Sequence, residues 1–562
     1  MGSGMRAVVA GPLPSARART YAVTGHPPVV GPLSEVLPVL RSGEDDGVRW
    51  VVWSATEILP ELVASGWRPA RIWDVAEVHR LLHGGRRAGP AVAWASAHEL
   101  GLDGIPGPPS EDLFATASDP SEDVVDAAGY LRGDAVAGSW LSAPERLVLW
   151  GEAAHACAER QRAQLVRLGP RALATALSES AASALCVELE SDGLPIDRGS
   201  ALRLIEAAAG PRPGSPAEEL RTRTRRDDAV RRHVPDGARF DLRNPASVRE
   251  MLHGVGIDVP TTRKWVLGAY QEVHPVVPAL LAWRADERIA TTYGYTWLDA
   301  HVGPDDRLRG RWTVSDGAAG RMTAQNGLHN LPAVLRPAVA AEEGHVLVRA
   351  DLGQIEPRVL AAVSGDPAFA AATRADDLYA PVAARLAVER RVAKVAVLAA
   401  MYGQRSGAAG EALRGLERAY PVAMSLLDRA YAAGLRGAPV RTFGGRLVRT
   451  DFGVRDHPVG ADRNLDAGRG RFARNAVIQG SAAELFKAWA ATVRAALRGS
   501  QARIVLCLHD ELLVHAPEAE APQVAAALHG CLDDAARRWV GSDAVRFVAD
   551  VSTIRRWSDA KP

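Results

Sequence analysis

An apolar hairpin near the C-terminal end constrains the fold of this chain more than any other feature. Residues 504–514 form two apolar runs on either side of Asp510, a pattern typical of two paired strands with a polar turn. A second apolar run, 346–348, leads to Asp351. A carboxylate that follows a strand emerges at the edge of a sheet, where it can hold a hard cation. The pattern therefore predicts two sheet-edge carboxylates, Asp351 and Asp510.

These two aspartates allow a chemical role and a plainer one. Phosphoryl transfer between two alcohol oxygens commonly uses two divalent metal ions, a few ångströms apart, held by such carboxylates. An isolated aspartate after a strand is more often a helix cap or a turn residue. The surrounding motifs are needed to distinguish a metal-binding role from a structural one.

Residues 390–403 place cations at a regular spacing. Arg390, Lys394, Leu398 and Tyr402 recur every four residues, so on a helix they lie along one gently drifting face. Two cations one turn apart suit a polyphosphate ligand. The simpler interpretation is an amphipathic surface helix, but the flanking residues are strongly apolar, so the charges need a partner. Lysine is rare among the 67 basic residues, and only four positions carry it: Lys264, Lys394, Lys487 and Lys561.

In this order, the motifs resemble those of family A DNA polymerases, the DNA polymerase I type. Residues 390–403 look like motif B, the O helix of the fingers, and His509-Asp510-Glu511 is similar to motif C. Residues 351–358 match motif A at five of eight positions: Asp351, Gln354, Ile355, Glu356 and Arg358.

Further segments agree with this resemblance. Arg471, Asn475 and Gln479 share the four-residue spacing of the family segment that contacts template and primer strands. Weaker similarities lie in 240–247, in the thumb-like region, and in 442–446. Another segment, one residue shorter than in the family, contains Gly320-Arg321 and His329-Asn330. The similarity covers residues 310–560 well, and five motifs in order make a chance resemblance very improbable.

The resemblance implies an α+β multidomain fold. A palm, fingers and thumb in a right-hand arrangement would be preceded by a ribonuclease H-like α/β domain of the 3′–5′ exonuclease type. The expected divisions are an exonuclease-like domain at 1–165, a thumb-like helical region at 166–309, palm at 310–365, fingers at 366–470 and palm again at 471–562.

The resemblance also implies roles for the motif residues. Asp351 and Asp510 would bind two Mg²⁺ ions, with Mn²⁺ as an alternative, and Glu511 would support that site. Arg390 and Lys394 would hold the triphosphate, and Lys394 would also protonate the leaving group. The remaining nucleotide-binding residues would be Gln354, Glu356, Tyr379, Leu398 and Tyr402. Glu356 would crowd the 2′ position of the sugar and Tyr402 would lie near the templating base. The DNA-binding residues would be Arg321, His329, Asn330, Arg471, Asn475, Gln479 and His509.

Four positions depart from the family pattern. Leu352-Gly353 replaces an aromatic residue and a serine, and Pro357 replaces a leucine. A proline at that point is tolerated only in the first turn of a helix. Leu398 stands where the family has Phe or Tyr, and Tyr379 where a His usually meets the β-phosphate. We therefore expect polymerase activity with altered nucleotide affinity or fidelity.

The exonuclease-like domain lacks the carboxylates that its chemistry needs. The first strand, interpreted as residues 19–23, has no acid, and no Asp or Glu occurs before Glu35. Only Glu57 is available at the second motif. At the third, residues 150–154 have Trp for Tyr and Ala for Asp. Two metals cannot be held without carboxylates, so we expect no proofreading.

Composition adds little to these expectations. The net charge of +1 does not mark a general polyanion binder, although 221–232 holds six arginines and suits either a solvated helix face or a phosphate-contacting surface. The longest apolar runs are short, so we expect no membrane span. Four widely spaced cysteines fit reduced thiols in a cytoplasm. We expect a nucleoid-associated monomer whose partners are primer–template DNA and deoxynucleoside triphosphates.

Three alternatives remain open from the sequence. A non-catalytic primer–template binding protein could keep the fold, although two intact aspartates argue against it. A bifunctional polymerase and 3′–5′ exonuclease is disfavoured by the missing carboxylates. An RNA-copying relative is disfavoured by Glu356.

Overall fold

The computed structural model describes residues 4–11, 19–107, 123–235, 240–316, 318–403, 409–452 and 458–560. The chain divides into two compact units. The first unit comprises Met1–Asp192, Arg311–Ala324 and Val348–Thr553, and the second comprises Gly193–Gly310, Gln325–Leu347 and Ile554–Pro562.

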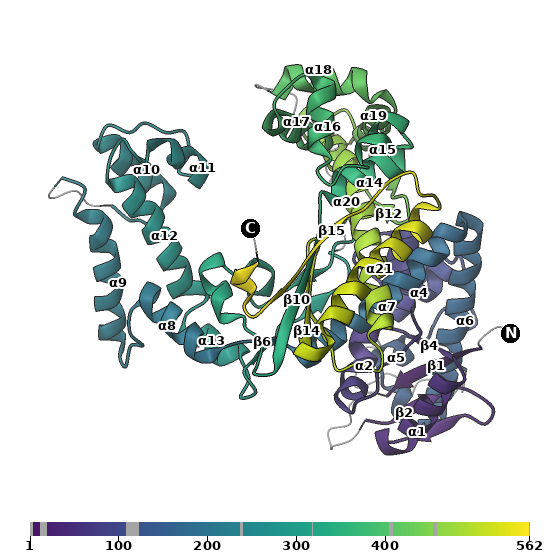
Figure 1. The fold of residues 1–562 in the computed structure, drawn as a ribbon. Helices are drawn as coiled ribbons and strands as arrows, with labels where there is room; N and C mark the ends of the chain where they lie inside the picture. The colour runs from purple at the N-terminus through teal and green to yellow at the C-terminus, as the bar shows by residue number, and fades with distance from the viewer. Residues whose placement is uncertain are drawn as a thin grey trace. The chain divides into compact units, whose positions relative to one another are not determined.

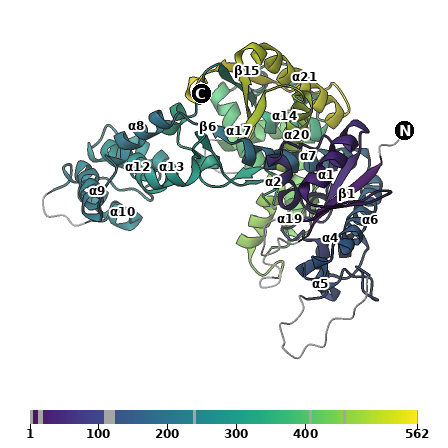
Figure 2. The same cartoon turned by 90° about the horizontal axis from the view of Figure 1, so that it is seen from below.

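The N-terminal part of the first unit is built on a five-stranded sheet, drawn in purple and blue in Figures 1 and 2. Its strand order is β3-β2-β1-β4-β5, in which β1 pairs antiparallel with β2 and parallel with β4. This mixed sheet agrees with the expected ribonuclease H-like α/β fold. The strands are β1 (Met5–Ala10), β2 (Tyr21–Val23), β3 (Val29–Gly31), β4 (Arg49–Val52) and β5 (Ile72–Asp74).

Helices cover both faces of this sheet because its central strands are apolar on both sides. Ala7 and Val9 join one buried cluster, whereas Val8 and Ala10 join the other, as the period of two along a strand requires. The helices of this part are α1 (Leu33–Asp45), α2 (Ala55–Ala64), α3 (Val75–His83), α4 (Pro90–Ala97), α5 (Gly133–Ala137), α6 (Pro144–Leu168) and α7 (Pro170–Asp192).

The sequence interpretation placed the first strand of this sheet at residues 19–23, which was wrong. That segment contains β2, the second strand, and the first strand is β1, next to it in the sheet. Both strands contain a short run of buried apolar residues, Ala7–Ala10 and Tyr21–Val23, so the hydrophobic pattern alone did not distinguish the first strand from its antiparallel neighbour.

A four-stranded sheet forms the centre of the rest of the first unit, in the order β13-β14-β10-β15. The predicted hairpin is confirmed as β13 (Arg503–Leu508) and β14 (Glu511–Pro517), and β10 spans His345–Leu352. The C-terminal end of the sheet is a single strand, β15 (Ala549–Ile554). Helices α20 (Arg463–Ala496) and α21 (Ala521–Val540) pack against each other beside this sheet (Figure 1).

The alanine-rich stretch after β10 is helical. These helices gather in one green group in Figure 1, and α19 packs along α20. They are α14 (Ile355–Ser364), α15 (Pro367–Ala372), α16 (Tyr379–Leu386), α17 (Arg390–Tyr402), α18 (Ala409–Ala419) and α19 (Pro421–Leu435). Two short hairpins complete the unit: β8 (Trp312–Thr313) with β9 (Thr323–Ala324), and β11 (Val440–Arg441) with β12 (Leu447–Val448).

Helix α7 connects the two sheets of the first unit. It packs against α2, α3, α6 and β5 on one side and against α20 on the other. Among the described residues it is the one helix long and apolar enough to cross a membrane, but 78% of that stretch is buried inside the protein. Its apolar character therefore follows from its place in the core.

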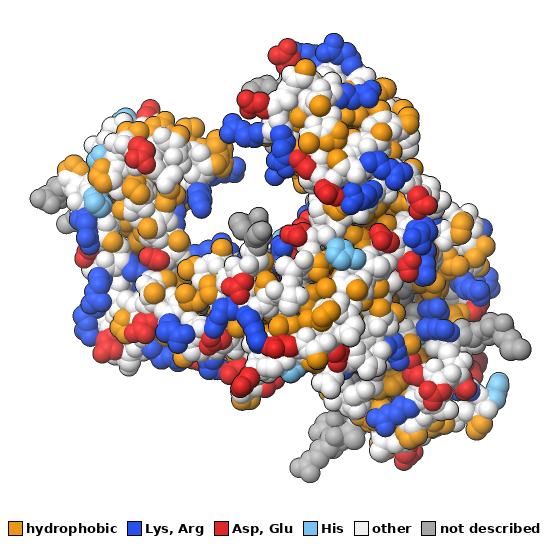
Figure 3. All heavy atoms as spheres, in the orientation of Figure 1, with side chains coloured by type: hydrophobic (Ala, Val, Ile, Leu, Met, Phe, Trp, Pro, Cys, Tyr) orange, Lys and Arg blue, Asp and Glu red, His pale blue; other side chains and the backbone are white. Residues whose placement is uncertain are grey.

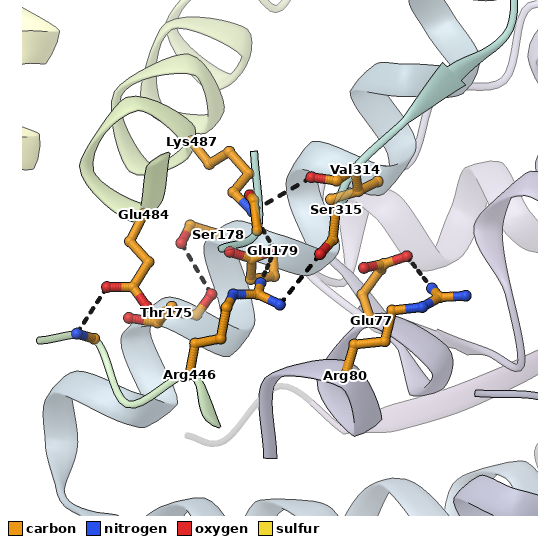
Figure 4. A network of polar contacts seen from close by, with 12 residues as sticks. Glu77, Arg80, Thr175, Ser178, Glu179, Val314, Ser315, Arg446, Glu484 and Lys487 are labelled. Carbon is orange, nitrogen blue, oxygen red and sulfur yellow. Dashed lines mark hydrogen bonds and ion pairs between the residues drawn. The ribbon is translucent and has the colours of Figure 1, made fainter. Parts of the chain in front are cut away.

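A buried charge network joins α7 to α20. Lys487 of α20 and Arg446, which follows β11, both form ion pairs with Glu179 of α7, at 2.5 and 2.7 Å (Figure 4). All three side chains are at most 3% exposed. Nearby, Glu484 accepts hydrogen bonds from the Thr442 hydroxyl and from the Gly444 amide.

The second unit is mainly helical. Its buried core lies between α10 and α12, with Val230 of α9 also contributing. The helices are α8 (Arg198–Ala209), α9 (Pro216–Arg231), α10 (Pro245–Gly254), α11 (Lys264–Leu267), α12 (Val276–Thr292) and α13 (Tyr295–His301), and β6 (Leu194–Pro195) pairs with β7 (Arg307–Leu308).

The arginine-rich segment of the sequence forms α9, whose exposed face shows basic side chains in Figure 3. Arg226 is ion-paired with Glu287, and Arg231 with Asp228. Arg223 and Arg225 are exposed. Part of the positive charge is therefore neutralised within the unit, and part faces solvent.

Candidate active site

The two predicted aspartates lie at one edge of the β13-β14-β10-β15 sheet. Asp351 is the penultimate residue of β10, and Asp510 lies in the two-residue turn between β13 and β14. The Leu352 amide donates to the Asp510 carbonyl at 2.9 Å, which ties the end of β10 to this turn. His509, the other turn residue, is exposed and has a φ of 54°, in the left-handed region that costs a non-glycine residue energy. The turn thus holds Asp510 beside Asp351.

The electrostatics of this edge favour a bound cation. Burial raises the pKa of Asp510 to about 6, and the charges of Asp351 and Glu511 add to this effect. Burial also raises the pKa of Asp351, with contributions from Glu511 and Asp550, while Arg349 opposes the shift. Carboxylates that raise one another's pKa carry an excess of negative charge, which a divalent cation relieves. The oxygen-rich residues present therefore fit Mg²⁺.

Two charged residues of this edge were not predicted from the sequence. Arg349 is buried, and its Nη2 lies 2.7 Å from Asp351 Oδ2 and 2.8 Å from Glu511 Oε2. Asp550 belongs to β15, on the other side of β10. Arg349 precedes Asp351 by two residues, so the period of the strand could have placed it on the same face. No local signal indicated Asp550.

The unusual residues after Asp351 have structural reasons. A Cβ atom at position 353 would lie 2.9 Å from Val548 Cγ2, so the close approach of residue 548 favours glycine there. Pro357 is the third residue of α14, where the backbone amides have no acceptor within the helix. This position agrees with the expectation of a first-turn proline.

Arg358 anchors the start of α14. Its side chain is fully buried, and burial lowers its pKa to about 10. Among the described residues it donates to the backbone carbonyls of Gly353, Thr373, Ala375, Asp376 and Arg546, at 2.6–3.0 Å. Arg358, although it matches motif A, therefore has a structural role in holding these backbone segments together.

Arg390 begins α17, and its guanidinium contacts the Asp377 carboxylate at 2.5 and 3.2 Å. Gln354 donates to the same carboxylate at 2.8 Å and accepts from the Leu378 amide at 2.8 Å. Asp377, which the sequence reasoning missed, thus holds two of the predicted nucleotide-binding residues together. Tyr379 is buried, and the Arg390 guanidinium lies 5.8 Å from the centre of its ring.

The other predicted α17 residues lie further along the helix. Lys394 is exposed and Leu398 is half-buried. The Tyr402 hydroxyl donates to Glu356 Oε2 at 3.1 Å, which connects the end of α17 to the start of α14. The helix predicted from the four-residue spacing is therefore confirmed as α17, and Lys394 on it is accessible to solvent.

A second polar cluster forms around Glu356. Arg321, in the loop between β8 and β9, forms an ion pair with Glu356 at 2.6 Å. Gln479 of α20, with its amide oxygen turned toward Arg321, accepts from that guanidinium at 2.9 and 3.0 Å. Three predicted residues, Arg321, Glu356 and Gln479, are thus brought together with Tyr402.

Helix α20 carries the remaining predicted residues of the first unit. Arg471 is exposed and Asn475 is half-buried. Arg474, which was not predicted, donates to the Ala400 carbonyl at 2.6 Å and contacts Asp428 at 2.7 Å, so it fixes α17 and α19 to α20. His329 and Asn330 belong to the second unit, where Leu328–Asn330 forms one turn of 3-10 helix.

The strands of the N-terminal sheet contain one acid among the described residues. This acid is Asp74, and its side chain is 2% exposed. Its carboxylate accepts from the Ala55 and Glu77 amides at 2.9 and 3.0 Å and so caps α3. The Asp74 carboxylate therefore has a structural role as a helix cap.

Comparisons with known proteins find DNA polymerases that are similar to this chain. The family model described as DNA polymerase family A matches residues 229–559. DNA polymerase I of Chloroflexus aurantiacus is 33% identical over 324 residues, which are 53% of this chain and 34% of that protein. The thermostable DNA polymerase I of Thermus thermophilus is 31% identical over 296 residues, 47% of this chain and 35% of that protein. These matches span about a third of the length of the two relatives.

A solved structure has the same fold. It is the POL domain of Pol1 from M. smegmatis in complex with DNA primer-template and dNTP. The TM-score is 0.67 at 20% sequence identity, with 98% of this chain and 95% of that chain covered. Because the family model matches more than half of the chain, across all the motifs of the site, the protein belongs to DNA polymerase family A.

Proposed function

We propose that the protein is a template-directed DNA polymerase that extends a primer 3′ end, acts in repair or gap filling, and does not proofread. The observation that carries this proposal is the position of Asp351 and Asp510 at one sheet edge, where burial raises both pKa values and neighbouring carboxylates add to the effect. The proposed partners are primer–template DNA and deoxynucleoside triphosphates, and the proposed cofactor is a pair of Mg²⁺ ions. The proposal includes the domain bounds expected from the sequence, which are thumb at 166–309, palm at 310–365 and 471–562, and fingers at 366–470.

The proposed mechanism assigns a task to each group of residues. Asp351 and Asp510 would hold the metal ions, which supply positive charge against the primer hydroxyl and the leaving pyrophosphate. Arg390 and Lys394 bind the triphosphate, and Lys394 donates a proton to the pyrophosphate oxygen. For this contact Arg390 exchanges its carboxylate partner, Asp377, for phosphate. Base pairing with the template selects the nucleotide in a closing pocket.

Glu356 is the proposed barrier against ribonucleotides. Its carboxylate is held between Arg321 and Tyr402, so it has little freedom to move away from a 2′-hydroxyl. We expect Glu356→Ala to lower the preference for deoxy- over ribonucleotides about 10- to 100-fold. The ratio of kcat/KM for the two nucleotides in single-nucleotide primer extension measures this change.

Glu417→Ala provides the control for this prediction, because Glu417 is an exposed acid on α18. It is expected to keep the wild-type ratio. An unchanged ratio in Glu356→Ala would show that another group excludes the ribose.

The absence of proofreading is tested separately. A primer with a labelled, mismatched 3′ nucleotide is incubated with the protein and Mg²⁺, without nucleotides. We expect no release of the label, because β1 and β2 carry no carboxylate and Asp74 is used as a helix cap. Release at a rate comparable to polymerisation would favour the bifunctional alternative.

A further inference from the structure

A buried arginine lies inside the carboxylate cluster of the candidate site. Arg349 is 9% exposed, and a single nitrogen of its guanidinium contacts both Asp351 and Glu511. Strand β10 lies between β14, which carries Glu511, and β15, which carries Asp550. The charges of Glu511, Asp351 and Asp550 all act on the guanidinium, which contacts an Asp351 oxygen that a metal ion would need.

We propose that Arg349 is a positioning residue that competes with a divalent cation for Asp351 and thereby sets the metal affinity of the site. This inference rests on the proposed metal-dependent function. It concerns Arg349, which lies outside the motif residues 351–358 and has no part in the mechanism above.

The charges explain the competition. Asp351 Oδ2 lies 2.7 Å from Arg349 Nη2, so a cation that binds this oxygen displaces the guanidinium or lies close to it. Two positive charges at that distance repel each other strongly in a half-buried site. At the same time, the guanidinium keeps Asp351 and Glu511 in place, because carboxylates this close would otherwise repel each other. Arg349 thus orders the site at the expense of metal affinity.

The test measures Mn²⁺ binding to the full-length protein without DNA or nucleotide, from the signal of free Mn²⁺ in electron paramagnetic resonance. Arg349→Gln is expected to bind Mn²⁺ at least about tenfold more tightly than the wild type. Arg349→Met also removes the charge, with an apolar side chain that tolerates burial, and is expected to behave in the same way. Adding Asp351→Asn to either variant should abolish the gain.

Arg503→Gln is the matched control, since Arg503 lies on β13 of the same sheet and donates only to the carbonyls of Ser500 and Ala502 among its hydrogen bonds in the described residues. It is expected to keep the wild-type Mn²⁺ affinity. A second readout is the Mg²⁺ concentration for half-maximal primer extension, which should fall in Arg349→Gln.

The outcomes separate this inference from the proposed function. Tighter Mn²⁺ binding in the Arg349 variants supports the inference even if the wild type extends no primer. Unchanged or weaker binding in folded Arg349→Gln and Arg349→Met, in a wild type that extends primers, overturns the inference and leaves the function intact.

Discussion

Replacing Asp510 by alanine is expected to lower Mg²⁺-dependent primer extension at least about 1000-fold, which corresponds to a loss of roughly 4 kcal/mol of transition-state stabilisation. Asp510 is one of the two proposed metal ligands, and it lies in the tight turn between β13 and β14. The measurement is the rate of single-nucleotide incorporation under saturating primer–template, compared with the wild type.

The control for this variant is Asp533→Ala, which removes an exposed carboxylate from α21 and should extend primers like the wild type. Binding of primer–template by Asp510→Ala, followed by fluorescence anisotropy, should change much less than its activity. Activity of Asp510→Ala within tenfold of the wild type would mean that Asp510 does not hold the metal.

The largest expected effect on stability comes from Glu179→Gln. Glu179 is the shared partner of Lys487 and Arg446, and all three are buried (Figure 4). Removing one side of a buried ion pair leaves uncompensated charge, which costs about 3–5 kcal/mol. Because two cations lose their partner, we expect a loss in this range in the free energy of unfolding, measured by urea denaturation with tryptophan fluorescence.

Glu159→Gln makes the same chemical change on an exposed part of the neighbouring helix α6. Its free energy of unfolding should stay within about 0.5 kcal/mol of the wild type. If Glu179→Gln is no less stable than Glu159→Gln, the network does not hold α7 to α20.

This network shows where sequence reasoning reaches its limit. Lys487 attracted attention as one of only four lysines, yet its partner Glu179 lies 308 residues away. Periodicity and spacing describe neighbours along one strand or helix, and they contain no information on which distant element packs against it. The pairing of α7 with α20 could therefore be known only from the structure.

The candidate site was more accessible to sequence reasoning because much of it is local. The hairpin around Asp510, the strand leading to Asp351 and the helix beginning at Arg390 follow from apolar runs and a four-residue spacing. Asp377, the partner of Arg390, was missed because it lies in a turn between α15 and α16, and Asp550 was missed because it comes from a strand distant in sequence. The contact of Gly353 with residue 548 likewise joins segments that are distant in sequence.

The most direct test of the proposed function is templated incorporation of a single nucleotide by the full-length protein. Four primer–templates that differ only in the first templating base are each offered all four deoxynucleotides with Mg²⁺. The account predicts that each primer is extended by the complementary nucleotide and that EDTA abolishes extension. Tight binding of primer–template without any Mg²⁺-dependent extension would contradict the account and identify a binding protein that has kept the polymerase fold.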